Sequence, residues 1–211
     1  TIKVLNPKEV VFEGGRELKL DAVSEVPRYY VYNAYGVCGI YSAPGTAVKE
    51  AYDTSGIVTN DRGVTVWLKG NRVSRNQIMA IKEESVTEQK NSLAVCLDNI
   101  LRHAGITRNT EYDLAQGKTA TTILSENMTG VQVLDLSGCT LDAVLYYVNQ
   151  DIPVLAILDD GEAVLVTGFN EFNVVIMEPS TGKLYKKGMN DATAWFAENG
   201  NHFITYMRTE N

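Results

Sequence analysis

The sequence predicts an α+β protein in two parts: a small sheet-plus-helix domain over residues 1–82 and a larger α+β domain over residues 83–211. Three observations support this fold class. Short segments rich in β-branched and aromatic residues, broken by Gly and Pro, fill the first part. An amphipathic helical stripe opens the second part, and a series of apolar segments separated by turn sequences follows it.

In the first part, two predicted strand pairs flank one predicted helix. RYYVYNAYGVCGIYS predicts a strand pair that turns at residues 33–36, and GIVTNDRGVTVWLKG predicts a hairpin that turns at residues 60–63. Between them, PGTAVKEAYDTSG predicts a helix with Pro44 in its first turn and Gly56 after its end. The polar stretch over residues 71–90 is the expected domain boundary.

The second part opens with the helix predicted in NSLAVCLDNILRHAG, which Gly105 can end. Its apolar residues recur at helical spacing: Leu93, Leu97, Ile100, Leu101 and Ala104. TEYDLAQ and TATTILSEN are weaker helical segments, and a short strand is expected over residues 131–134. TLDAVLYYVNQ predicts a second strong helix with Thr140 as its N-cap.

The rest of the chain predicts a meander of strands. The expected strands are IPVLAIL, EAVLVTGF, FNVVIME and KLYKK, joined by the turns DDG, NE and PSTG. DATAWFAEN then predicts a last helix, and HFITYM predicts a last strand.

Composition and charge indicate a globular chain and disfavour two classes of partner. With 45% hydrophobic and 21% charged residues, the 211-residue chain should fold as a globular protein. The net charge of −7 and the lack of a basic run disfavour nucleic acid and anionic membranes as partners. No apolar run approaches the roughly 18–20 residues of a membrane span. Because the sequence begins at Thr1 without Met or a signal peptide, we expect a trimmed or processed piece of something longer.

No metal or cofactor is expected. The 3 cysteines are scattered, without metal-ligand spacing, so they predict neither a disulfide framework nor a zinc site. Acidic residues gather at predicted turns, where carboxylates have backbone roles, and they lack the spacing of a calcium loop. These residues are Asp159, Asp160, Glu162 and Glu171.

Aromatic residues are dense in the first part of the chain. They fit either a small sheet–helix core or a ligand-binding surface, and we favour the core because faces cannot be assigned from sequence. They are Tyr29, Tyr30, Tyr32, Tyr35, Tyr41, Tyr52 and Trp67.

Residues 91–105, followed by IPVLAILDDGEAVLVTGFNEFNVVIMEPSTGK, resemble the peptidase C39-like branch of the papain-like cysteine peptidases. In that branch a helix starts with Cys-Gly and ends near Leu-x-x-x-Gly, a later Gly-His opens a strand that runs into Gly-aromatic, and a further strand ends in Asp-Pro-x-x-Gly. The resemblance covers roughly residues 83–211 and leaves residues 1–82 outside. It implies a papain-like domain in which a helix packs on an antiparallel sheet.

The positions of the catalytic residues, carried over by this resemblance, hold other residues. The nucleophile's place falls on Ser92, the histidine's on Glu162, and the place of the orienting Asp or Asn on Glu178. The oxyanion-hole glutamine is missing as well, because Val86 stands in its place and Gln89 is too close to the helix. The resemblance therefore implies degenerate catalytic positions.

These replacements work against catalysis. A papain-like thiolate needs an imidazolium and a helix N-terminus beside it, whereas the anion Glu162 raises the pKa of a neighbouring thiol or hydroxyl. Ser92 without an imidazole has no base suited to its proton. A simpler role for Ser92, or for Asn91, is the helix N-cap; a capping box at Ser85 and Glu88 would start the helix earlier.

Three other residues could supply a catalytic pair. Cys96 lies one turn after Ser92 and fits a small core residue better than a displaced nucleophile. His103 is in the last turn of the same helix, about 10 Å along the axis from Cys96, so these two cannot touch. His202 begins the final strand, and both histidines fit structural roles.

The sequence as a whole predicts a catalytically inactive C39-like domain. By family resemblance we expect an extracellular or cell-surface module of an exported bacterial protein, which binds a peptide or protein segment in the former active-site groove. Two alternatives stay open. One is an active hydrolase, with a cysteine engineered out at Ser92 or with a Ser92/Glu162 pair; the other is a structural spacer.

Overall fold

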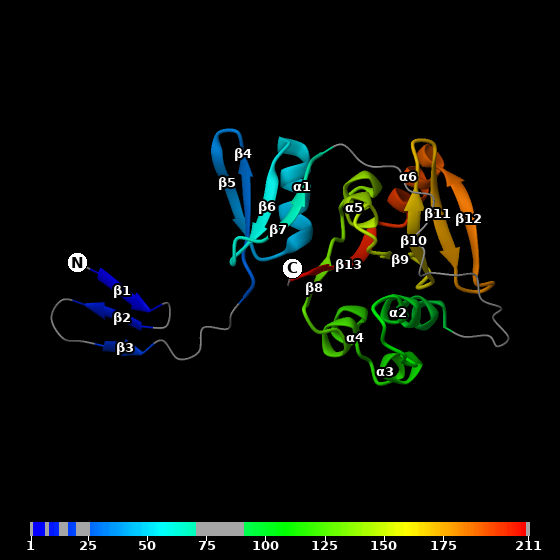
Figure 1. The fold of residues 1–211 in the computed structure, drawn as a ribbon, viewed down its shortest axis with the longest axis horizontal. Helices are drawn as coiled ribbons and strands as arrows, with labels where there is room; N and C mark the ends of the chain where they lie inside the picture. The colour runs from blue at the N-terminus through cyan, green and yellow to red at the C-terminus, as the bar shows by residue number, and fades with distance from the viewer. Residues whose placement is uncertain (1, 7–8, 13–16, 20–25, 71–90, 210–211) are drawn as a thin grey trace.

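The structure is a computed structural model that describes residues 2–6, 9–12, 17–19, 26–70 and 91–209, with the backbone alone before residue 26. Its strands form three antiparallel sheets (Figure 1). The helices are α1 (Pro44–Thr54), α2 (Ser92–His103), α3 (Glu111–Ala115), α4 (Ala120–Asn127), α5 (Leu141–Val148) and α6 (Met189–Glu198).

A six-stranded sheet forms the centre of the larger part, in the order β12-β11-β10-β9-β13-β8. Its strands are β8 (Val131–Asp135), β9 (Val154–Ile157), β10 (Ala163–Phe169), β11 (Asn173–Glu178), β12 (Lys183–Gly188) and β13 (His202–Arg208). Helices α2 and α4 cover one face and α5 and α6 the other, as Figure 1 shows. The predicted α+β class, with its antiparallel sheet and packed helix, is confirmed.

Helix α2 begins where the apolar stripe begins. The side chain of Asn91 accepts hydrogen bonds from the backbone N–H groups of Leu93 and Ala94, at 2.9 and 3.3 Å. Asn91 is thus the N-cap, and Ser92 is the first helical residue. The apolar stripe is buried at Leu97, Ile100 and Leu101. The rival capping box at residues 85–88 lies outside the described residues.

A four-stranded sheet and α1 form the smaller part, and the sheet order is β5-β4-β6-β7. Its strands are β4 (Tyr29–Asn33), β5 (Gly36–Tyr41), β6 (Ile57–Asn60) and β7 (Thr65–Leu68). The predicted pattern of two strands, helix and two strands is confirmed, with Pro44 in the first turn of α1. Asn60 fixes the second hairpin, because its Oδ1 accepts from the N–H groups of Arg62 and Val64.

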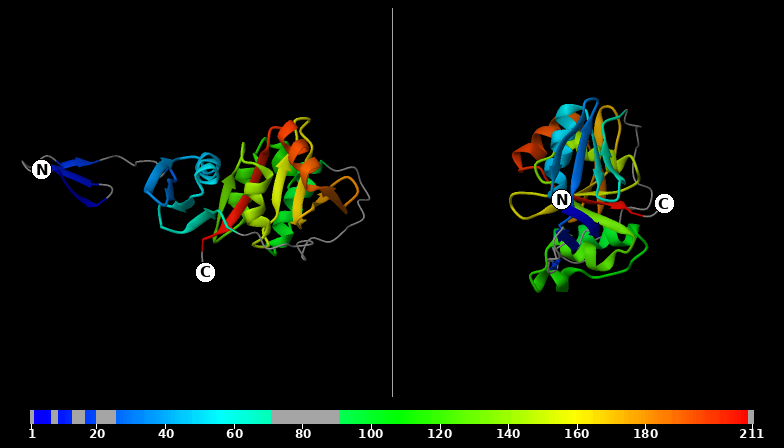
Figure 2. Two further views of the ribbon diagram at one scale, coloured as in Figure 1. Left: turned by 90° about the horizontal axis from the view of Figure 1, so that it is seen from above. Right: turned by 90° about the vertical axis from the view of Figure 1, so that its left-hand side faces the viewer.

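The two parts share one buried core, with α1 on the side of its sheet that faces the larger part (Figure 2). The Trp67 indole donates to the Ala143 carbonyl at 2.9 Å, and the Tyr147 hydroxyl donates to the Val66 carbonyl at 3.1 Å. At Gly45 the approach is so close that a Cβ would lie 3.0 Å from the Ser137 carbonyl oxygen. The two parts of the chain therefore contact each other through residues of one shared core.

The division at residues 82 and 83 remains a prediction, because residues 71–90 lie outside the described residues. The third sheet, which sequence reasoning did not anticipate, consists of β1 (Ile2–Asn6), β2 (Glu9–Phe12) and β3 (Glu17–Lys19) in that order. Within the part of the chain that the structure describes, no helix has the length and apolar character needed to cross a bilayer.

Candidate functional site

The predicted nucleophile position and the predicted histidine position lie side by side. Ser92 is the first residue of α2, and its Oγ accepts a hydrogen bond from the backbone N–H of Ala163 at 2.9 Å. Ala163 opens β10 and directly follows Glu162. The Ser92 side chain is buried, at 8% exposure, in this junction of helix and strand. We call Ser92, Cys96 and Glu162 the helix–strand junction.

Cys96 lies one turn further along α2 and is fully buried. Burial raises the pKa of its thiol well above the ordinary value of 9.0, and the negative charge of Glu162 raises the pKa further. The Glu162 carboxylate is thus close enough to act on the first turns of α2. Cys96 is a buried core residue, as predicted, and both effects on its pKa work against the thiolate that a nucleophile requires.

Glu178, the predicted place of the orienting residue, ends β11 beside β10. Leu165 pairs with Met177, so Glu178 lies at the same end of the sheet as Glu162. Its carboxylate accepts from the Thr181 hydroxyl at 3.0 Å within the turn that follows. Glu178 therefore stabilises a turn, and among the described residues no hydrogen bond joins its carboxylate to an imidazole.

The two histidines lie elsewhere. His103 is at the far end of α2, where its Nε2 is 2.6 Å from the Asp151 carbonyl oxygen. His202 opens β13 and pairs with Ile157, which in turn pairs with Ala163, so β9 separates His202 from β10. Its side chain is exposed. Among the described residues, no hydrogen bond joins either histidine to Ser92 or Cys96.

The thiols should differ sharply in reactivity. Cys38 is exposed, whereas Cys96 and Cys139 are buried, and burial raises the pKa of Cys139 to about 12. A thiol whose pKa is raised in this way stays protonated through pH 8, and burial also blocks access. We expect an aromatic disulfide reagent at pH 8 to modify Cys38 at once in native protein, and all 3 cysteines after denaturation. Rapid native modification of Cys96 would contradict the buried junction.

Among the described residues, no group of three or more His, Cys, Asp or Glu is arranged to hold a metal ion. Val86, which stands in the place of the oxyanion-hole glutamine, and Gln89 lie outside the described residues.

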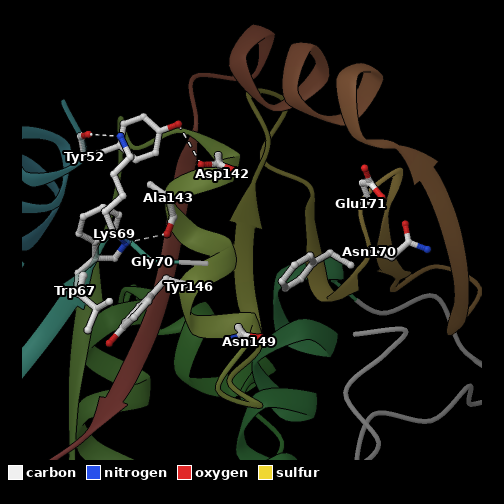
Figure 3. A pocket seen from close by; sticks show the side chains of 12 residues that line it. Tyr52, Trp67, Lys69, Gly70, Asp142, Ala143, Tyr146, Asn149, Asn170 and Glu171 are labelled. Atoms are coloured by element: carbon white, nitrogen blue, oxygen red, sulfur yellow. Dashed lines mark hydrogen bonds between the residues drawn. The ribbon is translucent and has the colours of Figure 1, made fainter. Parts of the chain in front are cut away.

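A cavity of about 640 Å³ lies at the seam between the two parts (Figure 3). We call it the seam pocket. Its lining combines aromatic, amide and charged side chains from both parts: Tyr52, Trp67, Leu68, Lys69, Gly70, Asp142, Ala143, Tyr146, Asn149, Phe169, Asn170 and Glu171. This volume is in the usual range of small-ligand sites, which often lie at domain interfaces.

Hydrogen bonds fix one wall of the seam pocket, as Figure 3 shows. The Tyr52 hydroxyl donates to Asp142 at 3.0 Å, and the Lys69 ammonium donates to the Tyr52 carbonyl at 3.0 Å. The same ammonium lies 4.7 Å from the centre of the Tyr52 ring. Burial raises the pKa of Tyr146, so its phenol stays protonated at neutral pH. The wall thus offers aromatic faces beside fixed charges.

The seam pocket and the helix–strand junction are separate. The junction contacts the start of β10 at Ala163, whereas the pocket borders the end of β10 at Phe169. Seven strand residues separate these ends by about 20 Å. Sequence reasoning weighed Tyr52 and Trp67 as binding residues but missed Asp142, Tyr146 and the other contributors. The two adjacent tyrosines in the sequence of α5 were the signal that could have indicated this wall of the pocket.

Comparisons with known proteins bear on the fold. No family model and no curated protein matches the chain. One solved structure that resembles it is a crystal structure from Bacillus anthracis described as a C39-like peptidase. The TM-score is 0.54 and the sequence identity 13%, over 67% of this chain and 100% of that chain. The chain therefore has a C39-like fold.

Proposed function

We propose that this C39-like fold is catalytically inactive and serves to bind a peptide or protein segment. The observation that carries the proposal is the helix–strand junction: the backbone N–H of Ala163, next to Glu162, donates to the buried Ser92 hydroxyl, and the negative charge of Glu162 acts on the buried Cys96 thiol. The junction brings the start of α2 against the start of β10 and holds no imidazole among the described residues.

The charge of the junction has the wrong sign for nucleophilic catalysis. An imidazolium beside a thiol stabilises the thiolate, whereas an anion stabilises the protonated form. Glu162 has this effect on Cys96, whose pKa it raises in addition to burial. The Ser92 Oγ accepts a hydrogen bond from the Ala163 N–H at 2.9 Å, and this bond supports a structural role for Ser92 at the helix start. Loss of triad members costs about a thousandfold or more in rate.

The seam pocket supports the binding role. Neither the seam pocket nor a further cavity of the described residues, which lies between β7, α5 and β13, is lined by the three predicted catalytic positions. The seam pocket offers aromatic faces, amides and the carboxylates of Asp142 and Glu171, a set that suits side chains of a bound segment. A peptide in the former active-site groove remains the other possible location. By resemblance, the module would belong to an exported bacterial protein outside the cell.

Turnover of a random peptide library tests the inactive part of the proposal. We expect no cleavage above the buffer rate by the wild-type chain, and no difference between it and Ser92→Ala, because the junction lacks a base. Mass spectrometry of the library before and after incubation measures this. Cleavage that Ser92→Ala abolishes would contradict inactivity and favour a Ser92/Glu162 hydrolase.

Selection of peptides from a displayed library tests the binding part. We expect selected peptides to lose affinity by about tenfold or more when Glu171→Trp adds a large side chain to the lining of the seam pocket. Glu198→Trp, which makes the same change at an exposed position of α6, is the matched control and should bind normally. Peptides that bind Glu171→Trp and wild type equally would move the site away from the seam pocket.

A further inference from the structure

The outer face of the four-stranded sheet is apolar and exposed. Helix α1 covers the other face, where Val31, Val58 and Trp67 are buried. On the outer face, strand pairing places side chains in two rows. One row is Ile40, Tyr30, Thr59 and Thr65; the other is Val37, Tyr32, Ile57 and Leu68. We call these eight residues the outer sheet face.

Five large apolar side chains of this face are exposed to solvent. Val37 is 59% exposed, Ile40 57%, Ile57 45%, Leu68 39% and Tyr32 37%. Single exposed apolar residues are ordinary, but here they adjoin one another across four hydrogen-bonded strands. Contiguous apolar patches of this kind mark interaction sites in soluble proteins.

Charge identifies the partner that the outer sheet face suits. None of its eight residues is charged, although the whole chain carries a net charge of −7. In a two-fold contact each residue faces the same surface on its mate, so any charge near the axis would meet a like charge. An uncharged face on an acidic chain lets two identical copies meet without that repulsion. We propose that the outer sheet face binds a second copy of this chain.

The size of the face sets the strength of this contact. Four strands about 4.8 Å apart, with about four residues each at about 3.3 Å, cover roughly 250 Å² in projection. Stable complexes bury about 800 Å² per partner. The proposed dimer is therefore weak and depends on concentration, with two sheets packed face to face as in a β-sandwich.

Residue 57 lies in the middle of its row, between Tyr32 and Leu68, which makes it the best place for a test. Sedimentation of the wild-type chain from about 1 to 500 μM should show the average mass rising from one chain toward two. Ile57→Glu and Ile57→Lys should each raise the dissociation constant by about tenfold or more, because like charges then face each other. An equimolar mixture of the two variants should recover association.

The exposed residue Tyr112, on α3, supplies the matched control. Tyr112→Glu adds the same charge outside the outer sheet face and should associate like the wild type. Thermal unfolding of each variant checks that Ile57 substitutions leave the fold intact, since a strand substitution costs up to about 1 kcal/mol. A wild-type chain that stays monomeric at every concentration, or Ile57 variants that associate unchanged, would overturn the proposal.

Discussion

A cysteine installed at position 92 is expected to change its pKa by about 2 units or more according to the residue at position 162. In Ser92→Cys alone, the thiol replaces a side chain that is 8% exposed and bonded to the neighbour of Glu162, so burial and negative charge should both favour the protonated form. In Ser92→Cys with Glu162→His, an imidazolium replaces the anion, and it adds to the favourable field at the start of α2. The thiolate should then form near neutral pH.

The measurement is the rate of alkylation of residue 92 against pH, followed by mass spectrometry of the peptide that contains it. Ser92→Cys with Glu162→Gln is the matched control, because it removes the negative charge without adding a positive one. Its pKa should fall between those of the other two variants. If the pKa of residue 92 were the same in all three variants, the charge at residue 162 would have no effect on residue 92. The electrostatic argument that the junction is catalytically inactive would then fail.

The sequence specified local structure well because its signals are local. The stripe from Leu93 to Leu101 predicts α2, and Asn60 to Gly63 predicts the hairpin turn; in both cases neighbouring residues supply the relevant hydrogen bonds. The exact first residue of α2 was the exception, because local signals did not determine which residue caps the helix. Asn91 and Ser92 can both cap a helix. In the structure Asn91 is the cap, and the Ser92 hydroxyl instead accepts from the N–H of Ala163, 71 residues away in sequence.

The seam pocket could not be predicted in the same way. Its walls come from β7, α5 and the turn after β10, which meet because the parts of the chain share a core. That packing depends on contacts such as Tyr147 to Val66, 81 residues apart in sequence, for which a single sequence carries no signal. The outer sheet face was missed for a related reason, because sequence alternation does not tell which face α1 covers.

The shared core also predicts how the protein unfolds. Trp67 is 2% exposed, contacts Tyr52 and Tyr146 by its ring, and donates to the Ala143 carbonyl. Trp67→Ala should lower the free energy of unfolding by about 3–5 kcal/mol, because it leaves a cavity between the parts. Trp67→Phe should cost less, since it keeps much of the ring and loses a hydrogen bond worth about 1 kcal/mol.

The chain itself provides the probe for this experiment. It contains 2 tryptophans, so in both variants Trp195 on α6 is the remaining one, within the larger part. If the two parts unfold as one unit, the Trp195 fluorescence transition should move to lower denaturant concentration in Trp67→Phe and further in Trp67→Ala. A Trp195 transition that stays in place, while circular dichroism shows an earlier loss of structure, would mean that the parts unfold independently. In that case the predicted boundary near residue 82 would separate two folding units in spite of the core they share.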